Sequence, residues 1–156
     1  MRQLTATSAT KRVAAGPPRW IRDLALATGV ATLAMGVWAF LFPEHFFSDF
    51  PIAGAEWVST LGAYNEHLMR DYGASQIGLG VAAIGVALAR STKSVASVML
   101  GYVIFGTLHL GYHAGNFGAF ATGSAVSQAT ALITFIAIPA AALVGIWNYT
   151  KKGINS

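Results

Sequence analysis

The stretch YNEHLMRDYGA, residues 64–74, contains four ionisable side chains within six residues: Glu66, His67, Arg70 and Asp71. Glu66 and Arg70 are four residues apart, and so are His67 and Asp71, which places each pair on one face of a helix. An imidazole beside a carboxylate can move a proton or bind a metal ion. Such groups within an apolar chain are costly to bury, so they mark a candidate functional site.

A second stretch, HLGYHAGN at residues 109–116, repeats the spacing with two imidazoles, His109 and His113. Together with a His/Asp pair they would supply nitrogen and oxygen ligands suited to Zn²⁺, Cu²⁺ or Fe²⁺. The predicted metal ligands are His67, Asp71, His109 and His113. The predicted ligand-binding residues are Glu66, His67, Arg70, Asp71, Tyr112 and Asn116.

Counting along the helices predicts that both stretches lie at one depth. Arg90 and Lys93 mark one membrane surface, and a helix needs about 20 residues to cross. Counting back reaches Asp71 and counting forward reaches His113, so both are expected just beneath the opposite surface.

Two other interpretations of this polar layer stay open. One is proton-linked or substrate-binding chemistry, with His109 as acid or base and Asp71 tuning it. The other is structural, with Arg70 paired to Asp71 or Glu66 and the histidines bonded between helices. The sequence does not decide whether the protein is an enzyme, and it identifies no cofactor beyond a divalent metal.

The composition of the chain indicates a membrane protein. Of its 156 residues, 54% are hydrophobic and 10% charged, against about 25% charged in soluble domains. The segment 94–150 contains no Asp, Glu, Lys or Arg. The basic residues lie at the ends of apolar runs rather than on one face, which argues against nucleic-acid binding. With no cysteine, disulfides, thiolate metal sites and iron–sulfur clusters are excluded.

Four apolar runs are each long enough to cross a bilayer as a helix. We expect spans at about 24–42, 64–89, 95–115 and 126–148 within one membrane domain, 23–150, flanked by tails at 1–22 and 151–156. The predicted fold is all-α, an antiparallel four-helix transmembrane bundle.

The distribution of charge predicts the orientation. All lysines and arginines except Arg70 fall on one side after four crossings, and all acids except Asp23 fall on the other. Both termini are therefore expected in the cytoplasm, in a multi-pass membrane protein. Its expected partners are the lipid bilayer and other membrane subunits or copies of itself.

Small residues and aromatic residues predict how the helices pack. Gly29, Thr32 and Gly36 would allow close contact of the first span. In the second span, a stripe of helical spacing carries the polar pair and is expected to face inward; it comprises His67, Asp71, Ala74, Gly78, Ala82, Gly85 and Ala89. The aromatic and acidic segment 43–63 is expected in the headgroup region, as a cover over the mouth of the helices.

The strings NEHLxRDxG, from residue 65, and HLxYH, from residue 109, resemble those of small bacterial four-helix membrane proteins similar to the DoxX-like group. The resemblance extends over roughly 24–147. It implies a compact four-span protein of the bacterial inner membrane that serves as an accessory of a membrane redox system, and it assigns no catalytic residues.

The function expected from the sequence is an accessory or ligand-binding integral membrane protein. Its outward polar layer would bind a small ligand or metal, or contact a partner subunit. The alternative is a membrane-embedded enzyme that uses His67, Asp71, His109 and His113. A proton-coupled transporter is disfavoured, because the inner half lacks the ionisable residues that a pathway needs.

Overall fold

The structure, a computed structural model, describes residues 16–154, and this part of the chain is helical without strands. Its α-helices are α1 (Arg19–Leu41), α2 (Pro43–Asp49), α3 (Glu66–Ala89), α4 (Thr92–Asn116) and α5 (Thr122–Ile154), with short 3-10 helices η1 (Ser59–Leu61) and η2 (Phe117–Ala119). Four of them, α1, α3, α4 and α5, are long and apolar enough to cross a membrane. The expected all-helical chain with four potential spans is confirmed. Most of the predicted N-terminal tail lies outside the described residues.

The helices extend beyond the apolar runs that predicted them. α1 begins at Arg19 rather than at residue 24, and α5 continues to Ile154 rather than ending at 148. Both extensions carry basic residues, among them Arg22 and Lys151. Charge marks where a helix leaves the apolar layer, but it does not end the helix.

Capping residues set the bounds of α3 and α4. Asn65 Oδ1 accepts a hydrogen bond from the Leu68 backbone N–H at 3.1 Å, so α3 begins at Glu66. α3 ends at Ala89, and its C-cap residue, Arg90, adopts a left-handed conformation with φ 58°. Ser91 Oγ then accepts from the Ser94 N–H at 3.3 Å and starts α4.

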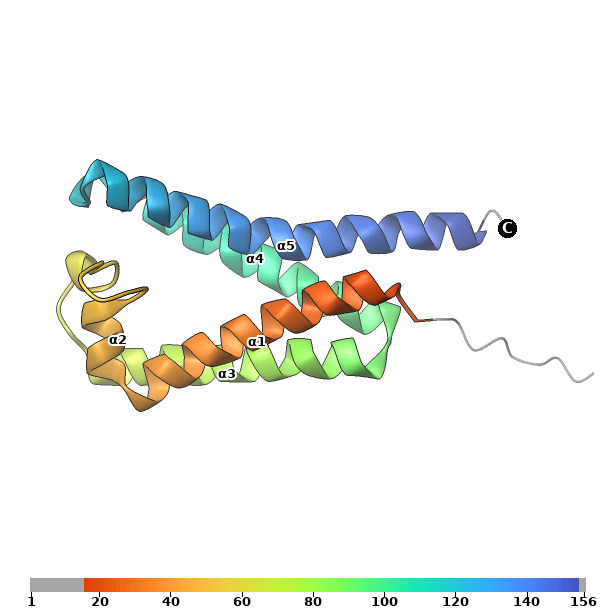
Figure 1. Cartoon of the computed structure of the whole chain (residues 1–156), viewed down its shortest axis with the longest axis horizontal. Coiled ribbons are helices and arrows are strands. Elements are labelled where there is room, and N and C mark those ends of the chain that lie inside the picture. Colours follow the sequence, from red (N-terminus) through yellow and green to blue (C-terminus); the bar gives the residue numbers. More distant parts are fainter. Residues whose placement is uncertain (1–15, 155–156) are drawn as a thin grey trace, which may run out of the picture.

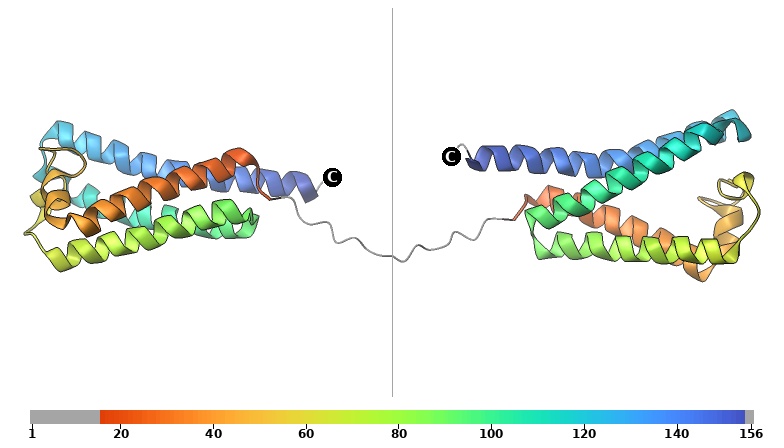
Figure 2. Two further views of the ribbon diagram at one scale, coloured as in Figure 1. Left: turned by 60° about the horizontal axis from the view of Figure 1, so that its bottom comes forward. Right: turned by 180° about the vertical axis from the view of Figure 1, so that it is seen from behind.

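The four long helices form two pairs. α1 lies beside α3, and α4 lies beside α5 (Figure 1). The pairs meet at the end where α3 turns into α4, and they diverge toward the end where α2 and its following loop lie between them (Figure 2). Buried residues gather mainly where the pairs meet; they include Ile21, Ala83, Met99, Tyr102 and Ala142.

Glycines bring the backbones of α1 and α3 into direct contact. A Cβ atom added at Gly73 would lie 2.6 Å from the Phe40 backbone nitrogen, and one at Gly36 would lie 2.8 Å from the Gly73 carbonyl oxygen. Gly29 and Gly80 meet in the same way, seven residues earlier in α1 and seven residues later in α3. The close contact predicted for Gly29 and Gly36 is confirmed, and its partners are the glycines of α3.

The inward face predicted for α3 is wrong. Every residue of the stripe that starts at His67 and Asp71 is exposed. The buried stripe comprises Met69, Gly73, Gln76, Gly80, Ala83 and Ala87. The two stripes start two residues apart, roughly 200° around the helix. Both contain small residues at helical spacing, so the pattern alone does not select the face; the match to the α1 glycines does.

An arginine from each of α1 and α3 binds the last turn of the other helix. Arg22, near the start of α1, donates from Nε to the Ala87 carbonyl at 3.0 Å. Arg70, near the start of α3, donates from Nη1 to the Phe40 carbonyl at 2.6 Å and from Nε to Glu66 Oε1 at 2.8 Å. Carbonyls of a last helical turn lack partners within the helix, and a cation there is favourable. Arg70 therefore joins α3 to α1.

Replacing Arg70 with leucine is expected to lower the free energy of unfolding by about 1–2 kcal/mol, because the Phe40 carbonyl and the Glu66 carboxylate lose their donor. Unfolding in mixed detergent micelles, followed by circular dichroism, measures the change. Arg19→Leu is the matched control, since its pairing with Asp23 at 3.7 Å is exposed and contributes little. Equal stability of the two variants would contradict the helix-joining role.

Candidate functional site

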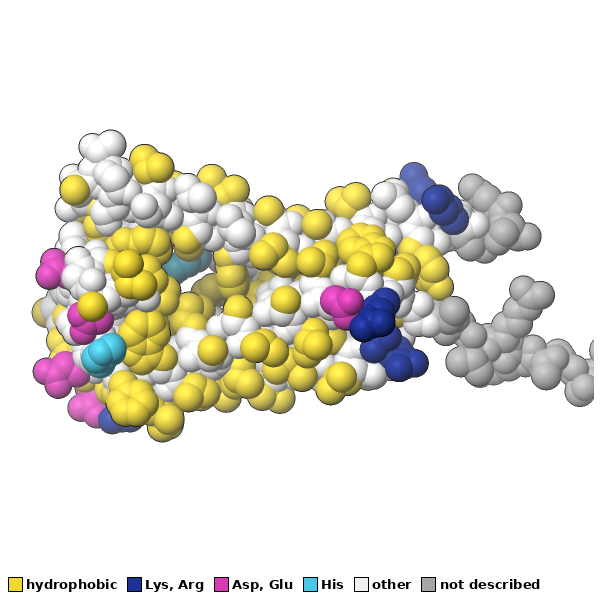
Figure 3. All heavy atoms as spheres, in the orientation of Figure 1, with side chains coloured by type: hydrophobic (Ala, Val, Ile, Leu, Met, Phe, Trp, Pro, Cys, Tyr) yellow, Lys and Arg dark blue, Asp and Glu magenta, His cyan; other side chains and the backbone are white. Residues whose placement is uncertain are grey.

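A cavity of about 470 Å³ lies between the two helix pairs at the end where they diverge. Its volume falls within the range of small-molecule sites, roughly 300–1,000 Å³. Figure 3 shows the hollow between the pairs, with a histidine side chain visible in its depth. Most of the lining is apolar or aromatic; it includes Phe46, Phe50, Trp57, Leu68, Met69, Tyr72, Phe105, Leu132 and Phe135.

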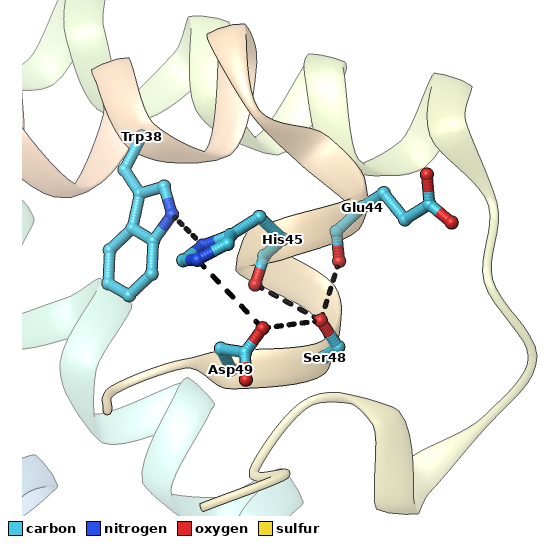
Figure 4. A network of polar contacts seen from close by, with 5 residues as sticks. All are labelled: Trp38, Glu44, His45, Ser48 and Asp49. Atoms are coloured by element: carbon cyan, nitrogen blue, oxygen red, sulfur yellow. Dashed lines mark hydrogen bonds and ion pairs between the residues drawn. The ribbon is translucent and has the colours of Figure 1, made fainter. Parts of the chain in front are cut away.

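Aromatic contacts and a polar network hold α2 at the cavity. Phe46 is 2% exposed and packs edge-on against Trp38, with 5.4 Å between ring centroids; it also packs against Phe50 in a tilted arrangement, with 4.7 Å between centroids. Trp38 Nε1 donates to His45 Nδ1 at 3.0 Å, and His45 Nε2 lies 4.0 Å from Asp49 Oδ2 (Figure 4). The segment 43–63 thus lines one side of the cavity, the place expected of a cover.

The opposite wall carries the polar groups of the cavity. His113 Nδ1 donates to Gln128 Oε1 at 3.0 Å, which joins α4 to α5. His109 packs edge-on against His113, with ring centroids 4.6 Å apart, and stacks on Phe105 at 5.5 Å. Gln128 is 1% exposed, and its Nε2 has no hydrogen-bond partner among the described residues.

Gln128 was missed in the sequence. An amide within an otherwise apolar helix is costly unless it is hydrogen-bonded, and that signal alone would have marked it. The histidine spacing drew attention to α3 instead, whereas the hydrogen-bond partner of His113 lies on α5, across the turn that follows α4.

The predicted polar layer divides into separate groups. His67 and Asp71 pair with each other, Nε2 to Oδ2, at 3.3 Å, and their side chains are 87% and 66% exposed. They do not line the cavity, which α3 meets through Leu68, Met69 and Tyr72. The reason is the rotation of α3 by about half a turn relative to the prediction.

Consequently the predicted metal site is not supported. Within residues 16–154, no three histidine, aspartate or glutamate side chains are placed to hold a metal ion together. His109 and His113 lie on the cavity wall, while His67 and Asp71 lie on an exposed face of α3.

The other predicted ligand-binding residues also separate. Tyr112 lines the cavity, and Asn116 donates from Nδ2 to the Tyr112 carbonyl at 2.8 Å. Glu66 and Arg70 border a second, more open depression together with Tyr64. Desolvation, followed by the nearby carboxylates of Glu66 and Glu44, raises the pKa of Tyr64 above its ordinary value, so its hydroxyl stays protonated.

The cavity suits an uncharged molecule. Of the described residues that line it, none is Asp, Glu, Lys or Arg, and the polar contacts on offer come mainly from His109, His113 and Gln128. Apolar contact with a few placed polar groups is typical of small-molecule sites.

A comparison of the chain with protein-family models, curated proteins and solved structures finds no match.

Proposed function

We propose that this protein is a multi-pass integral membrane protein that binds an uncharged lipophilic molecule in the cavity between its two helix pairs. The observation that carries the proposal is the cavity itself: about 470 Å³, lined by aromatic and aliphatic side chains, with one polar wall. A lipid-soluble ligand would enter from the bilayer and exchange apolar surroundings for aromatic contact and a few hydrogen bonds.

We also infer an antiparallel four-span arrangement with both termini in the cytoplasm of a bacterial cell. Lysines and arginines gather mainly at one end of the molecule, and acidic residues gather mainly at the end that holds α2 (Figure 3). Basic residues are retained on the cytoplasmic side of membrane proteins. In this orientation the cavity lies in the outer half of the membrane, and α2 faces the headgroups.

The ligand-binding role is favoured over the enzymatic alternative by the placement of the polar residues. An enzyme built on the four predicted residues would need them around one space, and only His109 and His113 border the cavity. The accessory role implied by the DoxX-like resemblance stays a prediction. In that role the protein would present its ligand to a partner subunit in the same membrane.

Trp57, in the cavity lining, provides the test. Purified protein in detergent is titrated with 1-bromoundecane, whose bromine quenches indole fluorescence, and the Trp57→Phe variant isolates the Trp57 signal. We expect saturable quenching of Trp57. Ala131→Phe, which fills the cavity, should abolish the saturable part, while Ala137→Phe on an exposed face of the same helix should keep it.

The proposal would be overturned if the quenching of Trp57 does not saturate but rises in proportion to the concentration of bromoundecane in the micelle. Saturable quenching that is unchanged by Ala131→Phe would also overturn it, because the probe would then lie elsewhere. Circular dichroism of both alanine variants shows whether α5 stays folded.

A further inference from the structure

Only one of the two polar atoms of the Gln128 side chain has a hydrogen-bond partner among the described residues. Its Oε1 accepts from His113 Nδ1 at 3.0 Å, whereas its Nε2, with two N–H donors, has no partner in the part of the chain that the structure describes. The residue is 1% exposed and lines the cavity. A buried donor without an acceptor is unfavourable, and it is most unfavourable where water is scarce.

The neighbouring polar groups do not complete this site. The Tyr72 hydroxyl, on the opposite side of the cavity, donates to Met35 Sδ at 3.4 Å. No carboxylate lines the cavity among the described residues. Because His113 Nδ1 already donates to Gln128, only the other ring nitrogen of that histidine is left for a ligand.

The two halves of the Gln128 amide have different surroundings. In the structure Gln128 Oε1 faces His113 Nδ1, so Nε2 is the half of the amide that is left for a ligand. Apolar and aromatic side chains surround it, among them Leu132 and Phe135 on its own helix. A fixed N–H donor in apolar surroundings favours the binding of a molecule that carries a hydrogen-bond acceptor over one that does not.

We propose that the ligand of the cavity is an uncharged lipophile with a carbonyl oxygen, a ketone or an ester, which accepts a hydrogen bond from Gln128 Nε2. This inference rests on the proposed ligand-binding function and adds the chemical class of the ligand. The carbonyl lies against the α4–α5 wall, and the apolar part of the ligand lies along the aromatic side chains of α2 and its following loop.

Competition between two matched molecules tests the assignment. Undecan-2-one and undecane are each used to displace 1-bromoundecane from the wild-type protein, with both corrected for their partition into the detergent. We expect the ketone to displace the probe at a concentration roughly three- to tenfold lower, the effect of one buried hydrogen bond. Gln128→Met, which keeps the length of the side chain and removes its N–H donors, should bind both molecules equally.

Gln76→Leu is the matched control. Gln76 is also buried and carries an unpartnered amide oxygen, but it does not line the cavity, so its replacement should leave the ketone preference unchanged. Equal displacement by ketone and alkane in the wild type would overturn the inference while leaving the ligand-binding function intact. A preference that persists in Gln128→Met would overturn it as well. Absence of saturable bromoundecane binding would overturn the proposed function, and this inference with it.

Discussion

Replacing Gly73 with leucine is expected to lower the free energy of unfolding by about 3 kcal/mol, the upper part of the usual range for overpacking. A Cβ atom at this position would lie 2.6 Å from the Phe40 nitrogen and 2.8 Å from the Gly36 carbonyl oxygen. These are backbone atoms, which cannot rotate away as a flexible side chain would. α1 and α3 must therefore separate, and that loosens a contact which runs along both helices.

The control for Gly73→Leu is Gly78→Leu, one and a half turns further along α3. A Cβ atom at Gly78 would meet no atom of a neighbouring element within 4 Å, so its variant should not lower the free energy of unfolding. The higher helix propensity of leucine should instead raise it by about 0.5–1 kcal/mol. Unfolding by SDS in mixed micelles measures both variants. The prediction fails if the two leucines are equally tolerated, since α1 and α3 would then not be in backbone contact.

The long helices were predictable because apolar runs and flanking charge are properties of the sequence alone. The segment 94–150 contains no Asp, Glu, Lys or Arg, which favours membrane-spanning helices, and residues 117–121 divide it into α4 and α5. Gly29 and Gly36 likewise indicated a close helix contact on their own. Their partners, Gly73 and Gly80, were not assigned, since that requires the position of a second helix.

The candidate site was predicted only in part, because it depends on the rotation of each helix about its axis. On α4, Tyr102 and Gly106 share the face of His109 and His113, and that face is buried or borders the cavity, so one side of the site was found. On α3 two stripes of small residues compete, and the polar one is exposed. When small residues cover both sides of a helix, the face that packs is decided by the neighbouring helix rather than by the hydrophobic period.

Phe46→Ala is expected to detach α2 from α1 and to abolish the saturable binding of 1-bromoundecane. Phe46 is 2% exposed and contacts Trp38, Phe50 and Tyr72, so its loss leaves a void where three elements meet. Truncating a buried phenylalanine costs about 3–5 kcal/mol. Because α2 is short, it keeps its place mainly through such packing, and the cavity loses its cover when α2 moves.

Phe46 contributes both to the packing of α2 and to ligand binding, and Phe42→Ala is the control for both effects. Phe42 is 62% exposed and lies just before α2, so its truncation should change neither Trp57 quenching nor unfolding by a comparable amount. If α2 covers the cavity, Phe46→Ala loses the binding of 1-bromoundecane at denaturant concentrations where the circular dichroism of the long helices is still complete. Retention of wild-type binding under those conditions would instead mean that α1, α3, α4 and α5 hold the ligand without α2. The segment 43–63 would then be a surface feature of the headgroup region, and the site would be open to the outer leaflet.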